Sequence, residues 1–71
     1  MIYFHKNLKY LRKQCHITQQ IVADQLNKAQ TTIANWEKGY CEPNLIELIV
    51  LASLFSISLD DLIMKDLSNK I

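Results

Sequence analysis

The chain has 71 residues, of which 49% are hydrophobic and 21% charged, with one Gly, one Pro and a net charge of +1. A chain of this length forms one small domain. The low content of Gly and Pro excludes a disordered tail or a turn-rich sheet protein and fits a compact helical domain. Two cysteines are too few for a disulfide framework.

The charges are unevenly distributed along the chain. Residues 1–40 carry six Lys or Arg against two acids, a balance of +4, whereas residues 41–71 carry two Lys against five acids, a balance of −3. A basic half suits a module that presents one end to phosphate. Solvated helix faces would give the same pattern, so charge alone leaves both interpretations open.

The sequence contains no recognisable targeting or membrane segment. Lys6 and Lys9 interrupt the N-terminal region, which therefore lacks the apolar run of a signal peptide. The apolar stretch Leu45–Phe55 is too short to span a bilayer and contains Glu47. We therefore expect a cytoplasmic protein without a membrane partner.

An apolar stripe predicts a first helix from about residue 4 to residue 15. The stripe recurs at helical spacing and consists of Phe4, Leu8, Leu11 and Cys15. Cys15 is accordingly expected to be a small core residue. Cys15, His16 and His5 lack the spacing of a four-ligand metal site, so we predict no metal.

Residues 18–39 predict two short helices with a tight break between them. Thr18 is a suitable N-cap for the first, Asn27 tolerates the left-handed conformation that the break requires, and Gly39 suits the end of the second. Apolar residues share one face of each helix, namely Val22, Ala23 and Leu26, then Ile33 and Trp36. Two helices this short need a shared core and cross steeply, as in a helix-turn-helix.

Two further helices follow. Asn44 and Glu47 form a capping box that opens a helix running to about Phe55. Its expected core face consists of Leu45, Leu48, Leu51, Ala52 and Phe55. Ser58 and Asp61 open a last helix in the same way, and its inward residues are Leu59, Leu62 and Ile63.

The predicted helix-turn-helix resembles that of the phage-repressor and Cro (Xre-type) family. The family pattern is matched at Thr18, Gln19, Ala23, Thr32, Ile33, Trp36, Glu37 and Gly39. Flanking matches extend the resemblance over about residues 4–63, through Leu8, Leu11, Arg12, Pro43, Leu48, Leu51, Ala52, Ser58, Leu59, Asp60 and Leu62. It implies an all-α fold, a compact five-helix bundle whose helices 2 and 3 form the helix-turn-helix, in one domain spanning residues 1–71.

The resemblance also implies roles for individual residues. The helix at about residues 30–37 would enter the major groove of double-stranded DNA and read bases with its polar outward face, formed by Gln30, Thr31, Ala34 and Asn35. The predicted phosphate contacts are Thr18, Gln19, Lys38 and Tyr40. Arg12 is expected to pair with Glu37, because a half-buried guanidinium needs a carboxylate; the alternative is an exposed Arg12 that contacts phosphate.

Three positions depart from the family pattern. Asn27 replaces the usual Gly of the turn, Ala29 replaces a capping Ser or Thr, and Ile21 replaces a polar residue and is expected to be exposed. None of these changes contradicts the fold, because Asn tolerates the left-handed conformation and a missing cap costs only about 0.5–2 kcal/mol.

We therefore predict a sequence-specific DNA-binding transcriptional regulator, of the repressor kind. The alternative is an antitoxin-like or other protein-interaction module on the same fold. No nucleophile–base–acid set and no Gly-rich phosphate loop is recognisable, so we expect neither an enzyme nor a cofactor.

Apolar residues that the core does not account for predict a symmetric homodimer on a pseudo-palindromic operator. Candidates for the interface lie on the outer face of the fourth helix and at helical spacing beyond it: Ile46, Ile49, Val50, Leu54, Met64, Leu67 and Ile71. The alternative is that the C-terminal segment folds back and covers Ile46 and Val50 within one chain.

Overall fold

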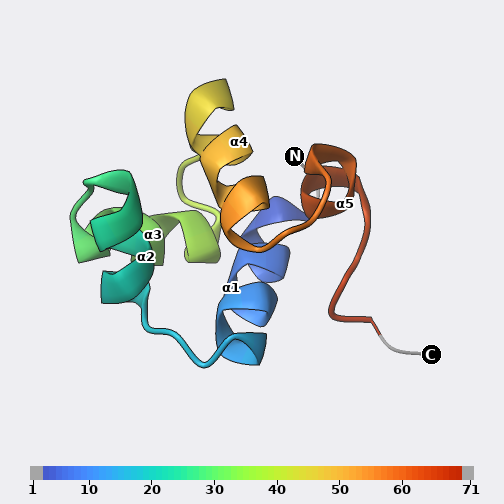
Figure 1. Ribbon diagram of the computed structural model, residues 1–71, viewed down its shortest axis with the longest axis horizontal. Helices are drawn as coiled ribbons and strands as arrows, with labels where there is room; N and C mark the ends of the chain where they lie inside the picture. The colour runs from blue at the N-terminus through green and yellow to red at the C-terminus, as the bar shows by residue number, and fades with distance from the viewer. Residues whose placement is uncertain (1–2, 70–71) are drawn as a thin grey trace.

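Five helices joined by short loops form the computed structural model, which describes residues 3–69 (Figure 1). They are α1 (Phe4–Gln14), α2 (Gln19–Leu26), α3 (Gln30–Lys38), α4 (Leu45–Leu54) and α5 (Leu59–Met64), and residues 3–69 contain no strand. Figure 1 shows α2 and α3 together at one end, α5 beside α1 at the other, and α4 between them. The predicted all-α five-helix bundle is therefore confirmed. None of these helices has the length and apolar character of a membrane span.

Side chains cap the beginnings of three helices as the sequence predicted. The hydroxyl oxygen of Thr18 accepts a hydrogen bond from the backbone N–H of Ile21, and that of Ser58 accepts one from Asp61. Asn44 and Glu47 form a complete capping box, in which each side chain accepts the other's backbone N–H at 2.8 and 2.9 Å. Each cap satisfies donors that the first turn leaves unpaired.

Left-handed residues terminate the first four helices. Asn27 (φ 57°) and Gly39 (φ 78°) were predicted, whereas His16 (φ 57°) and Ser56 (φ 55°) carried no sequence signal. Because α1 already ends at Gln14, the chain turns before the apolar stripe is complete, and Cys15 is exposed. The prediction of Cys15 as a core residue was therefore wrong.

All five helices contribute buried side chains to one core. An aromatic contact within it joins Phe4 to Trp36, whose rings are edge to face with centroids 6.4 Å apart. The other buried apolar residues are Leu8, Val22, Ala23, Ile33, Leu48, Leu51, Ala52, Phe55 and Leu62. The short helices, which would be only marginally stable alone, are thus held together by one shared apolar core.

The first turn of α4 differs from the prediction. Leu45 was expected to belong to the core face, but 62% of its surface is exposed. The beginning of α4 projects beyond the other helices in Figure 1, in keeping with the exposure of Leu45. The core face of α4 begins instead at Leu48.

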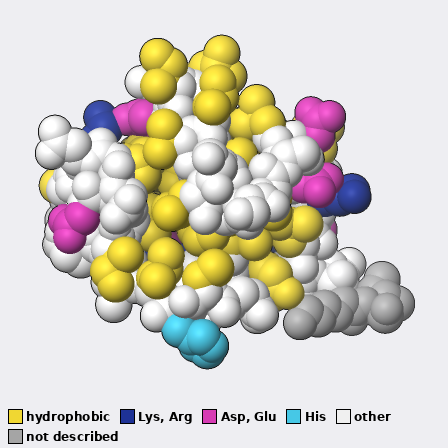
Figure 2. Space-filling model, in the orientation of Figure 1, with side chains coloured by type: hydrophobic (Ala, Val, Ile, Leu, Met, Phe, Trp, Pro, Cys, Tyr) yellow, Lys and Arg dark blue, Asp and Glu magenta, His cyan; other side chains and the backbone are white. Residues whose placement is uncertain are grey.

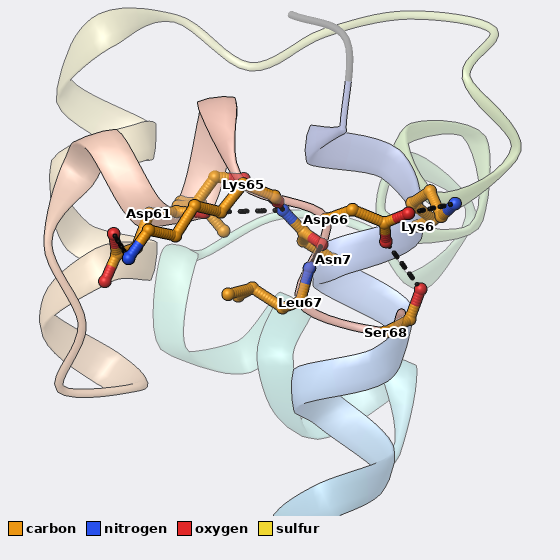
Figure 3. A network of polar contacts seen from close by, with 8 residues as sticks. Lys6, Asn7, Asp61, Lys65, Asp66, Leu67 and Ser68 are labelled. Atoms are coloured by element: carbon orange, nitrogen blue, oxygen red, sulfur yellow. Dashed lines mark hydrogen bonds and ion pairs between the residues drawn. The ribbon is translucent and has the colours of Figure 1, made fainter. Parts of the chain in front are cut away.

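The segment after α5 does not continue the helix. The helix ends at Met64, and Lys65 is extended, so the helical spacing predicted for Met64 and Leu67 does not occur; Ile71 lies outside the described residues. The segment turns back along α1 (Figure 3). Ile46 and Val50 remain 73% and 39% exposed. Within residues 3–69, the alternative that this segment covers them was therefore wrong.

Asn7 holds this segment in place. Its side chain is fully buried, and its amide group donates hydrogen bonds to the carbonyl oxygens of Leu62, at 2.8 Å, and of Lys65. Its Oδ1 accepts the backbone N–H of Leu67 at 3.0 Å (Figure 3). Asn7 thus satisfies both ends of the turn that terminates α5, where the orphan carbonyls of a helix end need donors.

An exposed ion pair flanks this contact. The ammonium group of Lys6 lies 3.1 Å from a carboxylate oxygen of Asp66, and its hydrogen bond lowers the pKa of Asp66. Because both side chains remain in contact with water, the pair contributes little to stability compared with the buried amide.

Replacing Asn7 with Asp should destabilise the fold. The substitution removes the two N–H donors and places a carboxylate against carbonyl oxygens, so we expect a loss of roughly 1–3 kcal/mol or more in the free energy of unfolding. Urea unfolding followed by circular dichroism measures it. Lys6→Ala is the control and should shift the free energy by less than about 1 kcal/mol. An Asn7→Asp variant as stable as the parent would contradict this role.

Candidate nucleic-acid interface

The helix-turn-helix is positioned by its buried faces. Val22 and Ala23 of α2 and Ile33 and Trp36 of α3 are at most 3% exposed, so each helix turns its other face outward. The left-handed Asn27 makes the tight break between them. The observed α3 begins at Gln30, as expected for the recognition helix.

An ion pair ties α1 to α3. Arg12 Nε and Nη2 donate to the two carboxylate oxygens of Glu37 at 2.7 and 3.1 Å, and Nη1 donates to the carbonyl oxygen of Ile17 at 3.0 Å. The side chains of Arg12 and Glu37 are 13% and 4% exposed. The ion pair expected between them is therefore present, and the alternative of an exposed Arg12 is wrong.

Two glutamines extend this pair towards the start of α3. Gln19 Nε2 donates to a carboxylate oxygen of Glu37 at 3.0 Å, which orients the Gln19 amide. Its Oε1 then accepts a hydrogen bond from Nε2 of Gln30. Gln30 keeps its own Oε1 and a second N–H for another partner. The predicted phosphate contact of Gln19 is untested, and in this structure its amide orients Gln30.

The remaining predicted residues lie along α2 and α3 or just beyond them. Thr31 is exposed, and Ala34 and Asn35 are half-buried. Lys38 and Tyr40 are exposed beside each other, with the Lys38 ammonium 5.7 Å from the centroid of the Tyr40 ring. Thr18 is exposed at the beginning of α2. Ile21, also on α2, is 43% exposed, as expected.

The sequence did not reveal a link between the turn and α4. Lys28 Nζ lies 2.8 Å from Oε2 of Glu47, the same residue that completes the capping box. The hydrogen bond from Lys28, and then that from the backbone of Asn44, lower the pKa of Glu47 below 4.5. A lowered carboxyl pKa contributes stability at pH values above 4.5 that is lost as the pH falls through the folded-state pKa. Only the fold brings these two residues together.

A hollow of about 340 Å³ lies beside the end of α3, and its walls include His5, Cys41 and Glu42. Among residues 3–69, no three His, Cys, Asp or Glu side chains are grouped so that they could hold a metal ion. The hollow therefore adds no metal site to the polar surface of α2 and α3.

The helix-turn-helix family model matches residues 8–62. The chain belongs to this helix-turn-helix family. The match includes α2, α3 and α4 and confirms the Xre-type resemblance drawn from the sequence.

Two relatives are bacterial proteins. The chain is 35% identical over 60 residues to the HTH-type transcriptional activator BcrR of Enterococcus faecalis, covering 84% of this chain and 29% of that protein. It is 41% identical over 56 residues to the HTH-type transcriptional regulator AnsR of Bacillus subtilis, covering 79% and 48%. The chain spans about 29–59% of the length of the curated relatives that it matches.

Solved structures share the fold. A transcriptional regulator from Listeria innocua superposes with a TM-score of 0.81 at 32% identity, over 92% of this chain and 66% of that one. The P22 c2 repressor, in complex with a synthetic operator, superposes with a TM-score of 0.80 at 25% identity, over 90% and 96%. The helix arrangement is thus that of a repressor solved on DNA.

Removing the negative charge of Glu37 should be costly. Glu37→Gln leaves the Arg12 guanidinium buried without a carboxylate, so we expect a loss of roughly 3–5 kcal/mol in the free energy of unfolding. Urea midpoints of the parent and the variant measure the difference. Lys65→Ala, which removes an exposed ion pair with Asp61, serves as the control and should cost about 0.5 kcal/mol or less. Equal midpoints for parent and Glu37→Gln would show that the pair is superficial.

Proposed function

We propose that the chain binds double-stranded DNA in a sequence-specific manner and regulates transcription as a repressor, with α3 in the major groove. The observation that carries this proposal is the hydrogen-bonded chain from Arg12 through Glu37 and Gln19 to Gln30. It fixes the orientation of an amide at the first residue of the helix that follows the turn. A fixed amide can discriminate between base edges, whereas a freely rotating one cannot do so as well.

Gln30 is the main base-reading residue in this proposal. Its free Oε1 can accept from N6 of adenine while its second N–H donates to N7, which is the bidentate contact typical of Gln. Thr31, Ala34 and Asn35 follow on the same helix. Thr and Ala methyl groups suit the thymine methyl, and Asn35 offers a second amide.

The phosphate contacts of the proposal flank these residues. Thr18 and Gln19 stand at the beginning of α2, and Lys38 and Tyr40 at the end of α3. Ala29, the N-cap of α3, has no side-chain acceptor, and its carbonyl oxygen accepts only the N–H of Thr32, so the backbone N–H groups of Gln30 and Thr31 can donate to an anion. Contacts at both ends of α3 would fix its register in the groove.

Two copies complete the proposal. One helix-turn-helix contacts few base pairs, and regulators of this kind gain affinity by placing two recognition helices about 34 Å apart on a pseudo-palindromic operator. We therefore propose a homodimer that acts in the cytoplasm, where bacterial DNA lies. Repression, as opposed to activation, is part of the proposal, because the similar proteins differ in this respect: BcrR is named an activator and P22 c2 a repressor. An antitoxin-like role remains the alternative.

Salt dependence tests DNA binding itself. The logarithm of the association constant should fall linearly with the logarithm of salt concentration, by about 0.9 per neutralised phosphate. Fluorescence anisotropy with a labelled duplex measures this slope. Lys38→Gln should reduce it by about 1 per copy, whereas Lys65→Gln, an exposed lysine after α5, should leave it unchanged. Absence of binding even at low salt would overturn the proposal and favour the protein-interaction alternative.

Gln30→Ala tests base reading. Loss of its amide should weaken binding to a selected cognate site by roughly 1–3 kcal/mol and leave binding to random duplex nearly intact. The cognate site comes from selection on a random duplex library with the parent protein. Gln20→Ala is a matched control, because the Gln20 amide contacts Asp24 within α2 and does not belong to the Glu37 network. Equal losses on both duplexes would refute the role of Gln30.

A further inference from the structure

Lys28 is the cation that precedes the recognition helix most closely. It lies in the break between α2 and α3, two residues before Gln30, and no other Lys or Arg occurs between Lys13 and Lys38. In the proposed function, the backbone N–H groups of Gln30 and Thr31 donate to an anion. A lysine ammonium group beside this anion site would be expected to add a phosphate contact.

The ammonium group of Lys28 is instead occupied by α4. Its Nζ lies 2.8 Å from Oε2 of Glu47. The other carboxylate oxygen, Oε1, accepts the backbone N–H of Asn44 at 2.9 Å, so the capping box fixes the position of the carboxylate. The Glu47 side chain is only 15% exposed, whereas that of Lys28 is 42% exposed. A fixed and largely covered carboxylate therefore holds the more exposed side chain of Lys28.

The carboxylate of Glu47 is ionised at neutral pH. The hydrogen bond from Lys28, and then that from the backbone of Asn44, lower its pKa. In the ionised form it attracts the ammonium group of Lys28 and repels phosphate. Glu47 belongs to the acidic second half of the sequence, and the fold brings its charge to the break of the helix-turn-helix.

The two cations that flank α3 differ in their partners. The ammonium group of Lys38, at the end of α3, lies 5.7 Å from the centroid of the Tyr40 ring. A neutral ring does not cancel the charge of Lys38, whereas a carboxylate cancels that of Lys28. Figure 2 shows no broad basic patch on the face in view, where Lys and Arg side chains lie at the margins next to acidic ones. Single pairs, and not a patch, therefore decide which cations can meet phosphate.

We propose that Glu47 withholds Lys28 from DNA phosphate and thereby lowers the affinity of this chain for DNA of any sequence. The inference rests on the proposed function and adds to it a residue that opposes binding. A phosphate contact carries no information about base sequence, so a free Lys28 would strengthen binding to every duplex. With Lys28 held by Glu47, discrimination is left to the side chains that α3 presents.

Binding to a random-sequence duplex tests the role of Glu47. Glu47→Gln keeps the capping box, because a glutamine oxygen also accepts the N–H of Asn44, and it releases Lys28. Fluorescence anisotropy should show binding that is tighter by roughly two- to fivefold at low salt, the equivalent of one exposed ion pair. The salt slope should steepen by about 0.9 per copy, for one more neutralised phosphate. An unchanged affinity and slope would overturn the proposal.

A double-mutant cycle separates the release of Lys28 from the general loss of a negative charge. Lys28→Gln alone should leave the salt slope unchanged, and Glu47→Gln should have no effect on the slope in the Lys28→Gln background. Asp24→Asn is the matched control, because Asp24 is an exposed acid of α2 whose carboxylate accepts from the Gln20 amide. It should leave the slope unchanged.

Two outcomes of this cycle contradict the proposal. A slope that falls by about 0.9 in Lys28→Gln alone would show that Lys28 already contacts phosphate in the parent. A slope that steepens equally with Glu47→Gln in both backgrounds would show that Glu47 acts by repulsion alone and does not withhold Lys28.

Lysine acetylation followed by mass spectrometry gives a second measurement. In the parent, bound DNA should protect Lys38 and leave Lys28 as reactive as in the free protein. In Glu47→Gln, bound DNA should protect both lysines. The measurement on the parent needs no substitution, so it does not depend on the stability of a variant. Protection of Lys28 equal to that of Lys38 in the parent would overturn the proposal.

The two proposals fail in different ways. A parent that binds the duplex with the expected salt dependence, but whose slope does not respond to Glu47→Gln, removes the role of Glu47 and leaves the DNA-binding proposal standing. A parent and variants that bind no duplex even at low salt overturn both proposals.

Discussion

The buried pair between Arg12 and Glu37 is the contact on which the interface depends. A charge removed from water is tolerated only if opposite charge and hydrogen bonds surround it, and each member of this pair satisfies the other in fork geometry. Because the two residues come from α1 and α3, the requirement fixes α3 against the rest of the bundle. Because Glu37 also accepts from Gln19 of α2, all three helices share one polar centre.

This polar centre reaches the surface through a short path. The Glu37 carboxylate orients Gln19, and Gln19 orients Gln30, so the position of a surface amide is set by a charge inside the protein. This support favours the base-reading role proposed for Gln30, because a side chain held by packed neighbours loses less conformational freedom on binding. The fold is shared with a transcriptional regulator from Listeria innocua and with the P22 c2 repressor, so in the proposed function the choice of bases belongs to the side chains that α3 presents.

The two surfaces of the molecule differ in chemistry. Apart from Ile21, the outward side chains of α2 and α3 are mainly polar, with Lys38 and Tyr40 at the end of α3, whereas α4 exposes aliphatic side chains. The Lys28–Glu47 pair joins the two regions, since it connects the turn of the helix-turn-helix to the first turn of α4.

The sequence by itself determined the helices, their caps and the turn, because periodicity, N-cap residues, Asn27 and Gly39 act over a few neighbouring positions. The pairing of Arg12 with Glu37 was also accessible, through the family pattern. The sequence misjudged Cys15 and Leu45, since a helical wheel does not show where a helix ends or where its neighbours stop. Only the tertiary structure decided the contacts of Asn7, Lys28 and Gln19, because their partners lie 11 to 60 residues away and local pattern carries no information about them.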